Sequence, residues 1–258
     1  MRIICLAENT AVSEAFGCEH GLSLWIETEG RRVLFDMGQT GLFAENAEKL
    51  GVDLAAADLA VLSHGHYDHG GGLGLFLVRN RTAPVYLNRY AFEPHYNGTE
   101  KYIGLDPALR ASGRLIFTEG TTEIGEGMIL TDCRDKEKQY ELGSFGLKMK
   151  ESGVFLPDDF RHEQYLLIEE KGRRILFSGC SHRGVMDIVR WFRPHVMIGG
   201  FHFSKLPVGD ALAEYAAVLD SYDTEYYTCH CTGAEQYAFM KERMGRLRYL
   251  AAGQTIDI

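Results

Sequence analysis

Three histidines and one aspartate stand within the six residues from His64 to His69, which read His-Gly-His-Tyr-Asp-His. A loop has no packing reason to collect three imidazoles and a carboxylate, so their density indicates a chemical role. Neutral imidazole nitrogen and carboxylate oxygen are ligands for divalent transition metals. Glycines at position 65 and at positions 70 to 72 let the backbone bend closely around an ion. We therefore predict a metal site whose ligands are His64, His66, Asp68 and His69.

Two segments of the chain repeat one another and indicate how these residues are positioned. Residues 20 to 38 align without gaps with residues 162 to 180, at a constant offset of 142, and nine of nineteen positions are identical. Each copy predicts an apolar strand, a turn at Gly30-Arg31-Arg32 or Gly172-Arg173-Arg174, and a second apolar strand. The identical spacing of these residues favours an internal duplication over a chance likeness between two amphipathic hairpins.

The residues after each hairpin also correspond. A helical stretch (residues 42–50 and 185–192) leads in each half to a buried strand (residues 59–62 and 196–198) that ends near histidine. Strands that are apolar throughout are covered on both faces, so helices are expected outside the sheets. The sequence therefore predicts an α/β fold, a four-layer αββα sandwich with internal pseudo-twofold duplication, with the histidine segment at the end of a strand.

We expect a single domain over residues 1–258, because no linker divides the chain. Its halves are expected at roughly 1–80 and 150–258. Between them, residues 81–149 combine short strands such as Val85-Tyr86-Leu87 with polar loops. This composition predicts an insertion or lid that faces the substrate.

The composition excludes several classes of protein. A formal net charge of −9 argues against nucleic acid as a partner, because phosphate binding needs clustered lysine and arginine. No apolar run approaches the ~20 residues that cross a bilayer. Six cysteines in 258 residues are too sparse for a disulfide framework, and the first residues resemble no leader. We expect reduced thiols, a cytoplasmic location and no membrane partner.

The pattern His-x-His-x-Asp-His after a strand resembles that of the metallo-β-lactamase-fold hydrolases. Their preceding Asp-x-Gly is matched by Asp36-Met37-Gly38, and their αββα duplication agrees with the repeat. The resemblance implies that His64 and His66 hold one metal ion while Asp68 and His69 hold a second. It also implies a bridging hydroxide that acts as the nucleophile, in a cleft between the two halves.

The second half departs from that family, whose bridging aspartate usually follows a Leu-Phe-Ser-Gly-like strand. Here Leu176 to Gly179 is followed by Cys180. The chain is similar to a narrower branch that carries the three motifs Gly179-Cys180-Ser181-His182-Arg183-Gly184, Gly199-Gly200-Phe201-His202 and Thr228-Cys229-His230-Cys231-Thr232-Gly233. That branch includes synthases of methanopterin biosynthesis, which join a dihydropterin diphosphate to ribofuranosylaminobenzene phosphate.

The motifs of the second half supply further candidate ligands. His182 and His230 are expected to bind metal. Cys180 is either a thiolate ligand or a small buried hydrophobe, and His202 binds metal, binds a substrate anion or lies in the core. Strand alternation predicts that Cys229 and Cys231 point away from His230 and are structural. The roles of two other histidines stay open. His95 either touches substrate or has no role in the site, and His162 either points at the site or is a structural residue at the start of a hairpin.

These residues predict a metal-dependent hydrolase in which a metal-activated hydroxide attacks a phosphate ester or a similar ester. Asp68 is the expected catalytic residue, because it brings negative charge beside the nucleophile. The expected cofactor is one or two divalent metal ions, zinc first, with manganese or iron as alternatives. The expected partner is a small, anionic substrate. Two alternatives remain: a synthase of the pterin-related type that ionises a diphosphate leaving group, and a non-catalytic metal-containing sensor.

Overall fold

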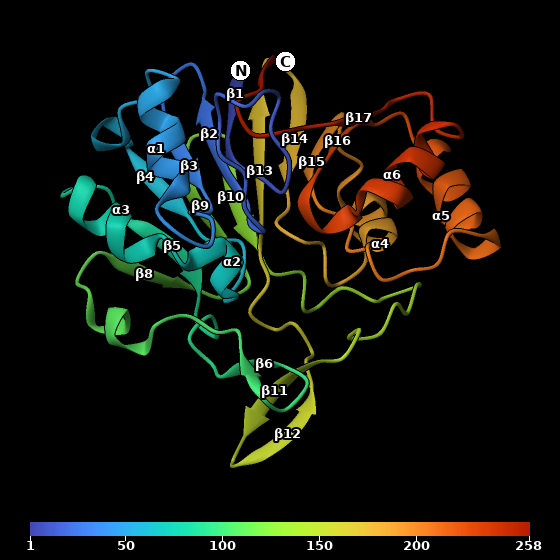
Figure 1. Cartoon of the computed structure of the whole chain (residues 1–258), viewed down its shortest axis with the longest axis horizontal. Coiled ribbons are helices and arrows are strands. Elements are labelled where there is room, and N and C mark those ends of the chain that lie inside the picture. Colours follow the sequence, from blue (N-terminus) through green and yellow to red (C-terminus); the bar gives the residue numbers. More distant parts are fainter. The chain divides into compact units, whose positions relative to one another are not determined.

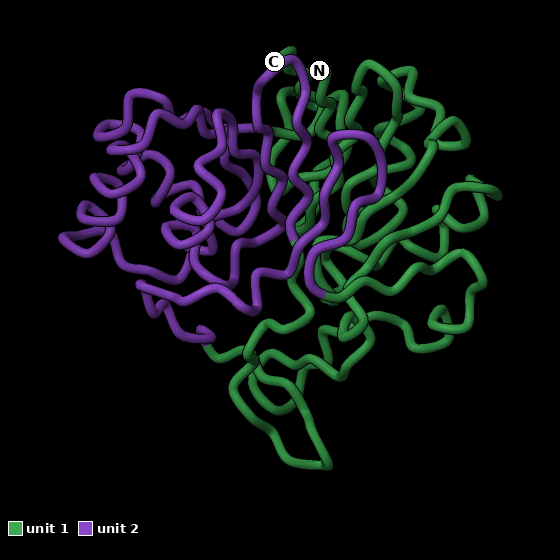
Figure 2. Tube along the Cα trace, turned by 180° about the vertical axis from the view of Figure 1, so that it is seen from behind, with its two compact units in different colours: residues 1–119, 146–164, 251–258 green, residues 120–145, 165–250 purple.

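The computed structural model describes residues 1–258, which divide into two compact units. Unit 1 consists of residues 1–119, 146–164 and 251–258, and unit 2 of residues 120–145 and 165–250. Figure 2 shows how the chain crosses between them, with unit 1 in green and unit 2 in purple. Each unit is therefore built from segments that are distant in the sequence.

Unit 1 contains a seven-stranded sheet with the order β18-β1-β2-β3-β4-β5-β8. The strands from β18 to β3 pair antiparallel, and those from β3 to β8 pair parallel. The strands are β1 (Arg2–Ala7), β2 (Ser23–Glu27), β3 (Arg32–Phe35), β4 (Leu59–Val61), β5 (Val85–Asn88), β8 (Leu115–Thr118) and β18 (Thr255–Asp257). The helices are α1 (Leu42–Lys49), α2 (Tyr67–Gly70) and α3 (Leu73–Arg79), and short 3-10 turns lie at Leu54–Ala56 and Pro107–Ala111.

Unit 2 contains a second seven-stranded sheet, with the order β9-β10-β13-β14-β15-β16-β17. Its pairing repeats that of unit 1, antiparallel from β9 to β14 and parallel from β14 to β17. The strands are β9 (Thr121–Gly125), β10 (Met128–Thr131), β13 (Tyr165–Glu170), β14 (Arg173–Phe177), β15 (Val196–Gly199), β16 (Glu225–Thr228) and β17 (Leu247–Tyr249). The helices are α4 (Val185–Phe192), α5 (Asp210–Asp220) and α6 (Ala234–Lys241), and none in the chain is long and apolar enough to span a membrane.

The two predicted hairpins form, and their registers are the same. In unit 1, Leu24 pairs with Phe35 across β2 and β3. In unit 2, Leu166 pairs with Phe177 across β13 and β14, which is the same pair displaced by the offset of the repeat, 166 − 24 = 142. The helices predicted after the hairpins are α1 and α4, labelled in Figure 1. The internal duplication seen in the sequence is thus present in the topology.

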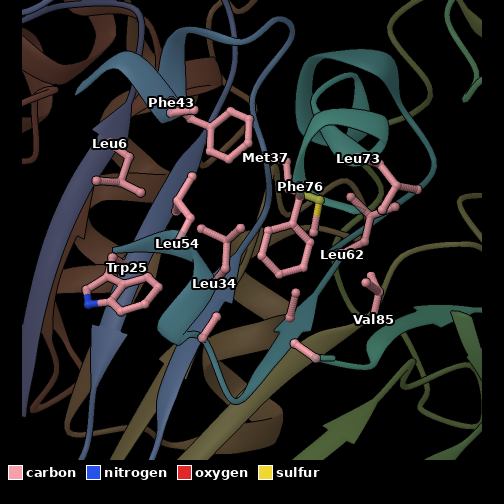
Figure 3. Close-up of a cluster of buried hydrophobic side chains, with 14 of the residues drawn as sticks. Leu6, Trp25, Leu34, Met37, Phe43, Leu54, Leu62, Leu73, Phe76 and Val85 are labelled. Atoms are coloured by element: carbon pink, nitrogen blue, oxygen red, sulfur yellow. The ribbon is translucent and has the colours of Figure 1, made fainter. Parts of the chain in front are cut away.

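The helices of unit 1 cover one face of its sheet. Figure 3 shows Phe43 of α1 and Phe76 of α3 in one cluster with Leu34 of β3, and all three side chains are fully buried. The neighbouring strand residues Val33 and Phe35, which point to the opposite face by strand alternation, are fully buried as well. This double burial explains why the strands are apolar throughout.

Unit 2 repeats this packing with its own helices. Leu176 of β14 lies at the position that corresponds to Leu34, and it is fully buried with Val189 of α4 and Leu219 of α5. Because each sheet is covered by helices of its own unit, each unit has a separate hydrophobic core on that side.

A third, four-stranded sheet belongs to unit 1 and has the order β12-β11-β6-β7. Its strands are β6 (His95–Asn97), β7 (Lys101–Tyr102), β11 (Leu147–Glu151) and β12 (Val154–Pro157). The expectation of one insertion over residues 81–149 needs correction. This stretch provides β5 and β8 to the sheet of unit 1 and β9 and β10 to that of unit 2, and only part of it builds the third sheet. Short strands join a sheet wherever a partner edge is free, and the local sequence does not show which edge.

We expect the corresponding leucines of the two cores to contribute alike to stability. Leu34→Ala and Leu176→Ala should each lower the free energy of unfolding by about 2–5 kcal/mol, because each leaves a cavity in a packed core. Val78→Ala is the control, since that side chain is 68% exposed and its loss should cost under about 0.5 kcal/mol. Urea denaturation followed by circular dichroism measures all three, and a cost near zero at either leucine would contradict the core assignment.

Candidate metal centre

The four candidate ligands of the first half lie together in unit 1. His64 and His66 occupy the connection after β4, and Asp68 and His69 lie in α2. The ring centroid of His64 is 4.7 Å from that of His66 and 4.1 Å from that of His69. All four residues are buried. Burial of so many polar side chains requires partners for each of them.

Asp36, at the end of β3, holds the histidine segment by several hydrogen bonds. Its Oδ1 accepts from the backbone N–H of Ser63 at 2.7 Å, and its Oδ2 accepts from Ser63 Oγ at 2.7 Å. The same Oδ2 is 2.7 Å from Nδ1 of His69. Asp36 thus contacts residues at both ends of the segment. Its backbone is in the left-handed region, with φ of 59°, where β3 turns away from the sheet.

These hydrogen bonds fix the ring orientation of two histidines. A carboxylate only accepts, so His69 donates from Nδ1, and Nε2 is the nitrogen without a proton in the neutral ring. Ser63 Oγ donates to Asp36, so it accepts from Nδ1 of His64, which is 2.8 Å away. In the neutral ring of His64, too, Nε2 is therefore the nitrogen without a proton. Metal-binding histidines are oriented in this way, with one ring nitrogen held by the protein and the other facing the ion.

The surroundings move the pKa of two of these histidines in opposite directions. Burial alone lowers the pKa of His69, but the charge and hydrogen bond of Asp36 outweigh it, and the pKa is raised. The pKa of His66 is lowered, chiefly by burial, which the nearby carboxylate of Asp158 only partly offsets. A buried His66 is therefore held as the neutral imidazole that a metal ion requires.

Asp68 lies at the start of α2 with its carboxylate near two histidines. Its Oδ2 is 3.3 Å from Nε2 of His20 and 4.0 Å from Nε2 of His69. The backbone carbonyl of Asp68 accepts from the N–H of Leu22, so the residue is held against the first hairpin. His20, the first residue of the first repeat, is thus a neighbour of the predicted catalytic carboxylate.

Glycine is required at position 65 because the backbone of the histidine segment lies close to the backbone of Ala91. A Cβ at this position would lie 2.0 Å from the carbonyl oxygen of Ala91. Any side chain would push the loop away, so glycine lets His64 and His66 lie on a backbone pressed against its neighbour. Gly65 is thus required by contact with Ala91, and a bend of the glycine-rich backbone around an ion stays a prediction.

The second-half candidates lie in unit 2. Ligand atoms of Cys180, His230 and Cys231 are all within 4.8 Å of one another, and the three residues are buried. This corrects the prediction that Cys231 points away from His230. Strand β16 ends at Thr228, and residues His230–Thr232 form a 3-10 turn, in which the two-residue alternation of a strand does not apply. Sequence reasoning therefore missed Cys231.

His182 and His202 form a second pair in unit 2. Their ring centroids are 4.3 Å apart, and the ring of Phe145 lies 5.1 Å from that of His202. His202 has a backbone φ of 56°, a conformation that few residues other than glycine adopt. The structure thus brings His182 beside His202. A common centre of His182 and His230 with the ligands of unit 1 stays a prediction.

Three residues lie beside His66: His95 and His162, whose roles the sequence analysis left open, and Asp158, which it did not single out. The ring centroid of His162 is 5.0 Å from that of His66 and 3.8 Å from that of His95. Oδ2 of Asp158 lies 2.8 Å from Nδ1 of His95. His95 and His162 offered a weak signal as histidines in motifs without a clear role. Asp158 offered none, because nothing in its neighbourhood along the chain distinguishes it from other acidic residues.

The donors present fit a divalent transition ion. Unit 1 offers the imidazoles of His64 and His69 with the carboxylate of Asp68, and unit 2 offers a thiol and an imidazole in Cys180 and His230. Imidazole, carboxylate and thiolate are the usual zinc ligands in proteins. The orientation of His64 and His69 by hydrogen bonds is the observation that favours a metal over a merely polar loop.

Comparisons with known proteins find a matching family and several similar proteins. The model of the Metallo-beta-lactamase superfamily matches residues 16–222. An uncharacterised protein of Methanocaldococcus jannaschii is 30% identical over 263 aligned positions, covering 98% of this chain and 98% of the relative. In the same organism, 7,8-dihydropterin-6-methyl-4-(beta-D-ribofuranosyl)-aminobenzene-5'-phosphate synthase is 29% identical over 285 positions, covering 99% and 96%. A solved metal-dependent hydrolase of the beta-lactamase superfamily is 30% identical with a TM-score of 0.85, covering 100% and 99%.

Asp36→Asn should weaken metal binding without unfolding the protein. The amide keeps the shape of the side chain but removes the charge that holds the Nδ1–H of His69, and loss of such a partner typically costs about 10- to 100-fold in metal affinity. Competition with a chelating dye measures the Zn²⁺ dissociation constant. Asp58→Asn serves as control, because that carboxylate accepts from the backbone of Arg32 and has no contact with histidine. Equal constants for Asp36→Asn and the parent would refute the orienting role.

His162 should make the metal-free protein less stable in acid. Burial, followed by the charge of His95, lowers the pKa of His162 to about 3, against 6.5 for an unperturbed histidine. Between these values the unfolded chain binds the proton and the folded protein does not, so stability falls as the pH falls. Between pH 7 and pH 5, protonation of this group in the unfolded chain should lower the free energy of unfolding by about 2 kcal/mol.

Urea denaturation of chelator-treated protein at pH 7 and pH 5 tests this expectation. In His162→Gln, the difference in the free energy of unfolding between pH 7 and pH 5 should be about 2 kcal/mol smaller than in the parent. This holds whatever the substitution does to stability at pH 7. His195→Gln, which replaces an exposed histidine of unit 2, should keep the pH dependence of the parent. If all three proteins lose stability equally, His162 is not the group responsible.

Proposed function

Because the chain belongs to the metallo-beta-lactamase superfamily, we propose that it is a metal-dependent hydrolase that acts on a phosphate ester or a similar ester. The observation that carries this proposal is the hydrogen-bond network of Asp36, Ser63, His64 and His69, which puts the ring proton of both histidines on Nδ1 and so makes Nε2 the nitrogen able to bind a cation. A hydrolase of the same superfamily shares the whole length of the chain at 30% identity. Both facts favour retained metal chemistry over the alternative of a non-catalytic sensor.

The proposed ligands are those expected from the sequence. They are His64, His66, Asp68 and His69 of unit 1 with His182 and His230 of unit 2, and Cys180 and His202 are further candidates for metal or substrate. Zinc is the proposed ion, in one or two copies. A divalent ion held there would polarise the scissile group and lower the pKa of water towards about 7.

The chain's own residues supply orientation and a proton acceptor. Asp36 fixes the ring of His69, and Ser63 fixes that of His64, so neither ring needs to reorganise during the reaction. Asp68 is the one carboxylate of the histidine segment, and it is held between His20 and His69. Its negative charge is suited to hold a water molecule in line and to accept its proton.

A second candidate function is a synthase that ionises a diphosphate leaving group and joins two substrates. It is supported by the relative that is named as a dihydropterin-linked synthase and matches this chain over 99% of its length. Release of pyrophosphate from a dihydropterin diphosphate, without water as the acceptor, would identify the synthase. Hydrolysis in a panel of phosphate monoesters, phosphodiesters and lactones, after elemental analysis of the purified protein, would identify the hydrolase.

We also propose a small, anionic substrate and a cytoplasmic location. None of the six cysteines is in a disulfide, and five of them are buried. Buried free thiols persist in a reducing compartment, which supports the proposed location. A net charge of −9 makes an extended nucleic-acid surface a poor alternative.

Asp68→Asn should abolish most of the activity and leave the fold intact. The amide preserves the shape but neither accepts a proton nor attracts the water, and general acid–base help is typically worth about 10²- to 10⁴-fold. We expect kcat/KM on the substrate found in the panel to fall at least about a hundredfold, with circular dichroism and thermal stability nearly unchanged in metal-replete buffer.

The matched control for this variant is Asp223→Asn, an exposed carboxylate of unit 2 paired with Arg246. It should keep the parent's turnover. Near-full turnover of Asp68→Asn would show that Asp68 is only a structural residue of the loop, and the proposed hydrolytic mechanism would then fail.

A further inference from the structure

His20, the exposed histidine that begins the first repeat, lies against the carboxylate of Asp68. Its Nε2 is 3.3 Å from Oδ2 of Asp68, and its side chain is 58% exposed to solvent, against 12% for that of Asp68. An exposed side chain contributes little to the stability of the fold. The contact between His20 and Asp68 therefore calls for an explanation other than packing.

The ring of His20 is held so that Nε2 is its donor atom. Nδ1 of His20 is 3.2 Å from Nδ2 of Asn9, and an amide nitrogen only donates, so Nδ1 accepts. Oδ1 of the same Asn9 side chain accepts from the backbone N–H of Gly21 at 3.4 Å, which fixes the orientation of the amide. In the neutral ring the proton is therefore on Nε2, the atom that faces the carboxylate of Asp68.

The backbone next to His20 is held against Asp68 as well. The N–H of Leu22 donates to the backbone carbonyl of Asp68 at 3.2 Å. A Cβ at position 21 would lie 2.6 Å from the same carbonyl oxygen, so glycine at that position lets the two segments approach one another. Backbone contacts thus place His20 beside the carboxylate, and the pair does not depend on the conformation of one side chain alone.

The first residue of the second copy of the repeat has the same arrangement. His162 corresponds to His20 at the offset of the repeat, 162 − 20 = 142, and its Nδ1 accepts from the N–H of Gly65 at 2.8 Å. The proton of its neutral ring is therefore on Nε2, which is 3.5 Å from Oδ2 of Asp158. His162 is buried, so its N–H helps to offset a buried charge. His20 is exposed, and the carboxylate that it faces is the predicted catalytic one.

We propose that His20 is a positioning residue that acts through Asp68, an inference that rests on the proposed function. The Nε2–H of His20 donates to Oδ2 and fixes the direction of the carboxylate, so Asp68 does not need to reorganise when it holds an ion or a water molecule. In this role His20 is not itself a metal ligand, because its Nε2 carries the proton. Loss of such an outer partner typically weakens metal binding about 10- to 100-fold.

Two substitutions at position 20 test the proposal through the affinity for Zn²⁺, measured by competition with a chelating dye. His20→Leu keeps a side chain of similar size but cannot donate, whereas His20→Gln places an amide N–H near the position of Nε2. The affinity should fall about 10- to 100-fold in His20→Leu and less than about threefold in His20→Gln. His195→Leu is the matched control and should keep the parent's affinity, because His195 is also exposed and accepts at Nδ1, from the N–H of Arg174.

A double-mutant cycle with Asp68→Asn tests whether His20 acts through the carboxylate. If it does, His20→Leu lowers the Zn²⁺ affinity of the parent but causes no further loss in the Asp68→Asn protein. An equal loss in both proteins would show that His20 acts independently of Asp68, and would overturn the proposal. His20→Leu should also keep the parent's midpoint in urea denaturation of the metal-free protein. A lowered midpoint would assign His20 a role in stability instead, and would overturn the proposal as well.

The same measurements separate this inference from the proposed function. If Asp68→Asn weakens Zn²⁺ binding and His20→Leu does not, the role of His20 is overturned and the proposed function stands. If neither substitution changes the Zn²⁺ affinity, Asp68 is not a ligand, and the metal centre of the proposed function fails together with the role of His20.

Discussion

The carboxylate of Asp36 has no exposure to solvent, and a buried charge is tolerated only where donors surround it. Its donors are the backbone and hydroxyl of Ser63 and the ring of His69. They can reach it because β3 and β4 are parallel neighbours, so that the ends of both strands meet at one edge. The placement of the histidine segment therefore depends on a strand pairing and on one charge. The ring of His64 is fixed through the same hydroxyl of Ser63.

The duplicated hairpin shows how one scaffold carries two chemistries. Ser178 occupies the position that corresponds to Asp36, and each donates its backbone N–H to the neighbouring parallel strand at 2.9 Å, to Ile198 and Val61 respectively. The backbone is thus conserved between the units while the side chain is not. Ser178 contacts Ser181 through its hydroxyl and places no charge beside the motif that follows. Unit 1 orients histidine with a carboxylate, and unit 2 gathers thiols and imidazoles.

The local parts of this molecule could be predicted from its sequence. Helix α4 covers the predicted residues 185–192, the hairpins have the register that the repeat implies, and the fold class is confirmed by the family match and the solved relative. Contacts between residues far apart in the sequence could not be predicted. Asp158 meets His95 across 63 residues of chain, and no periodicity marks such a contact. Cys231 was misplaced because the strand ends at Thr228, where a turn of different period begins.

The position of β18 bears on how the molecule is assembled as it is synthesised. Residues Thr255–Asp257 pair with β1, although all of unit 2 lies between them in the chain. One side of the strand Arg2–Ala7 therefore has no partner in its sheet until the ribosome has made unit 2. During that interval it is an open strand edge of the kind that pairs with other chains. The nascent protein thus depends on rapid completion, or on a chaperone, to keep its first strand from association with its neighbours.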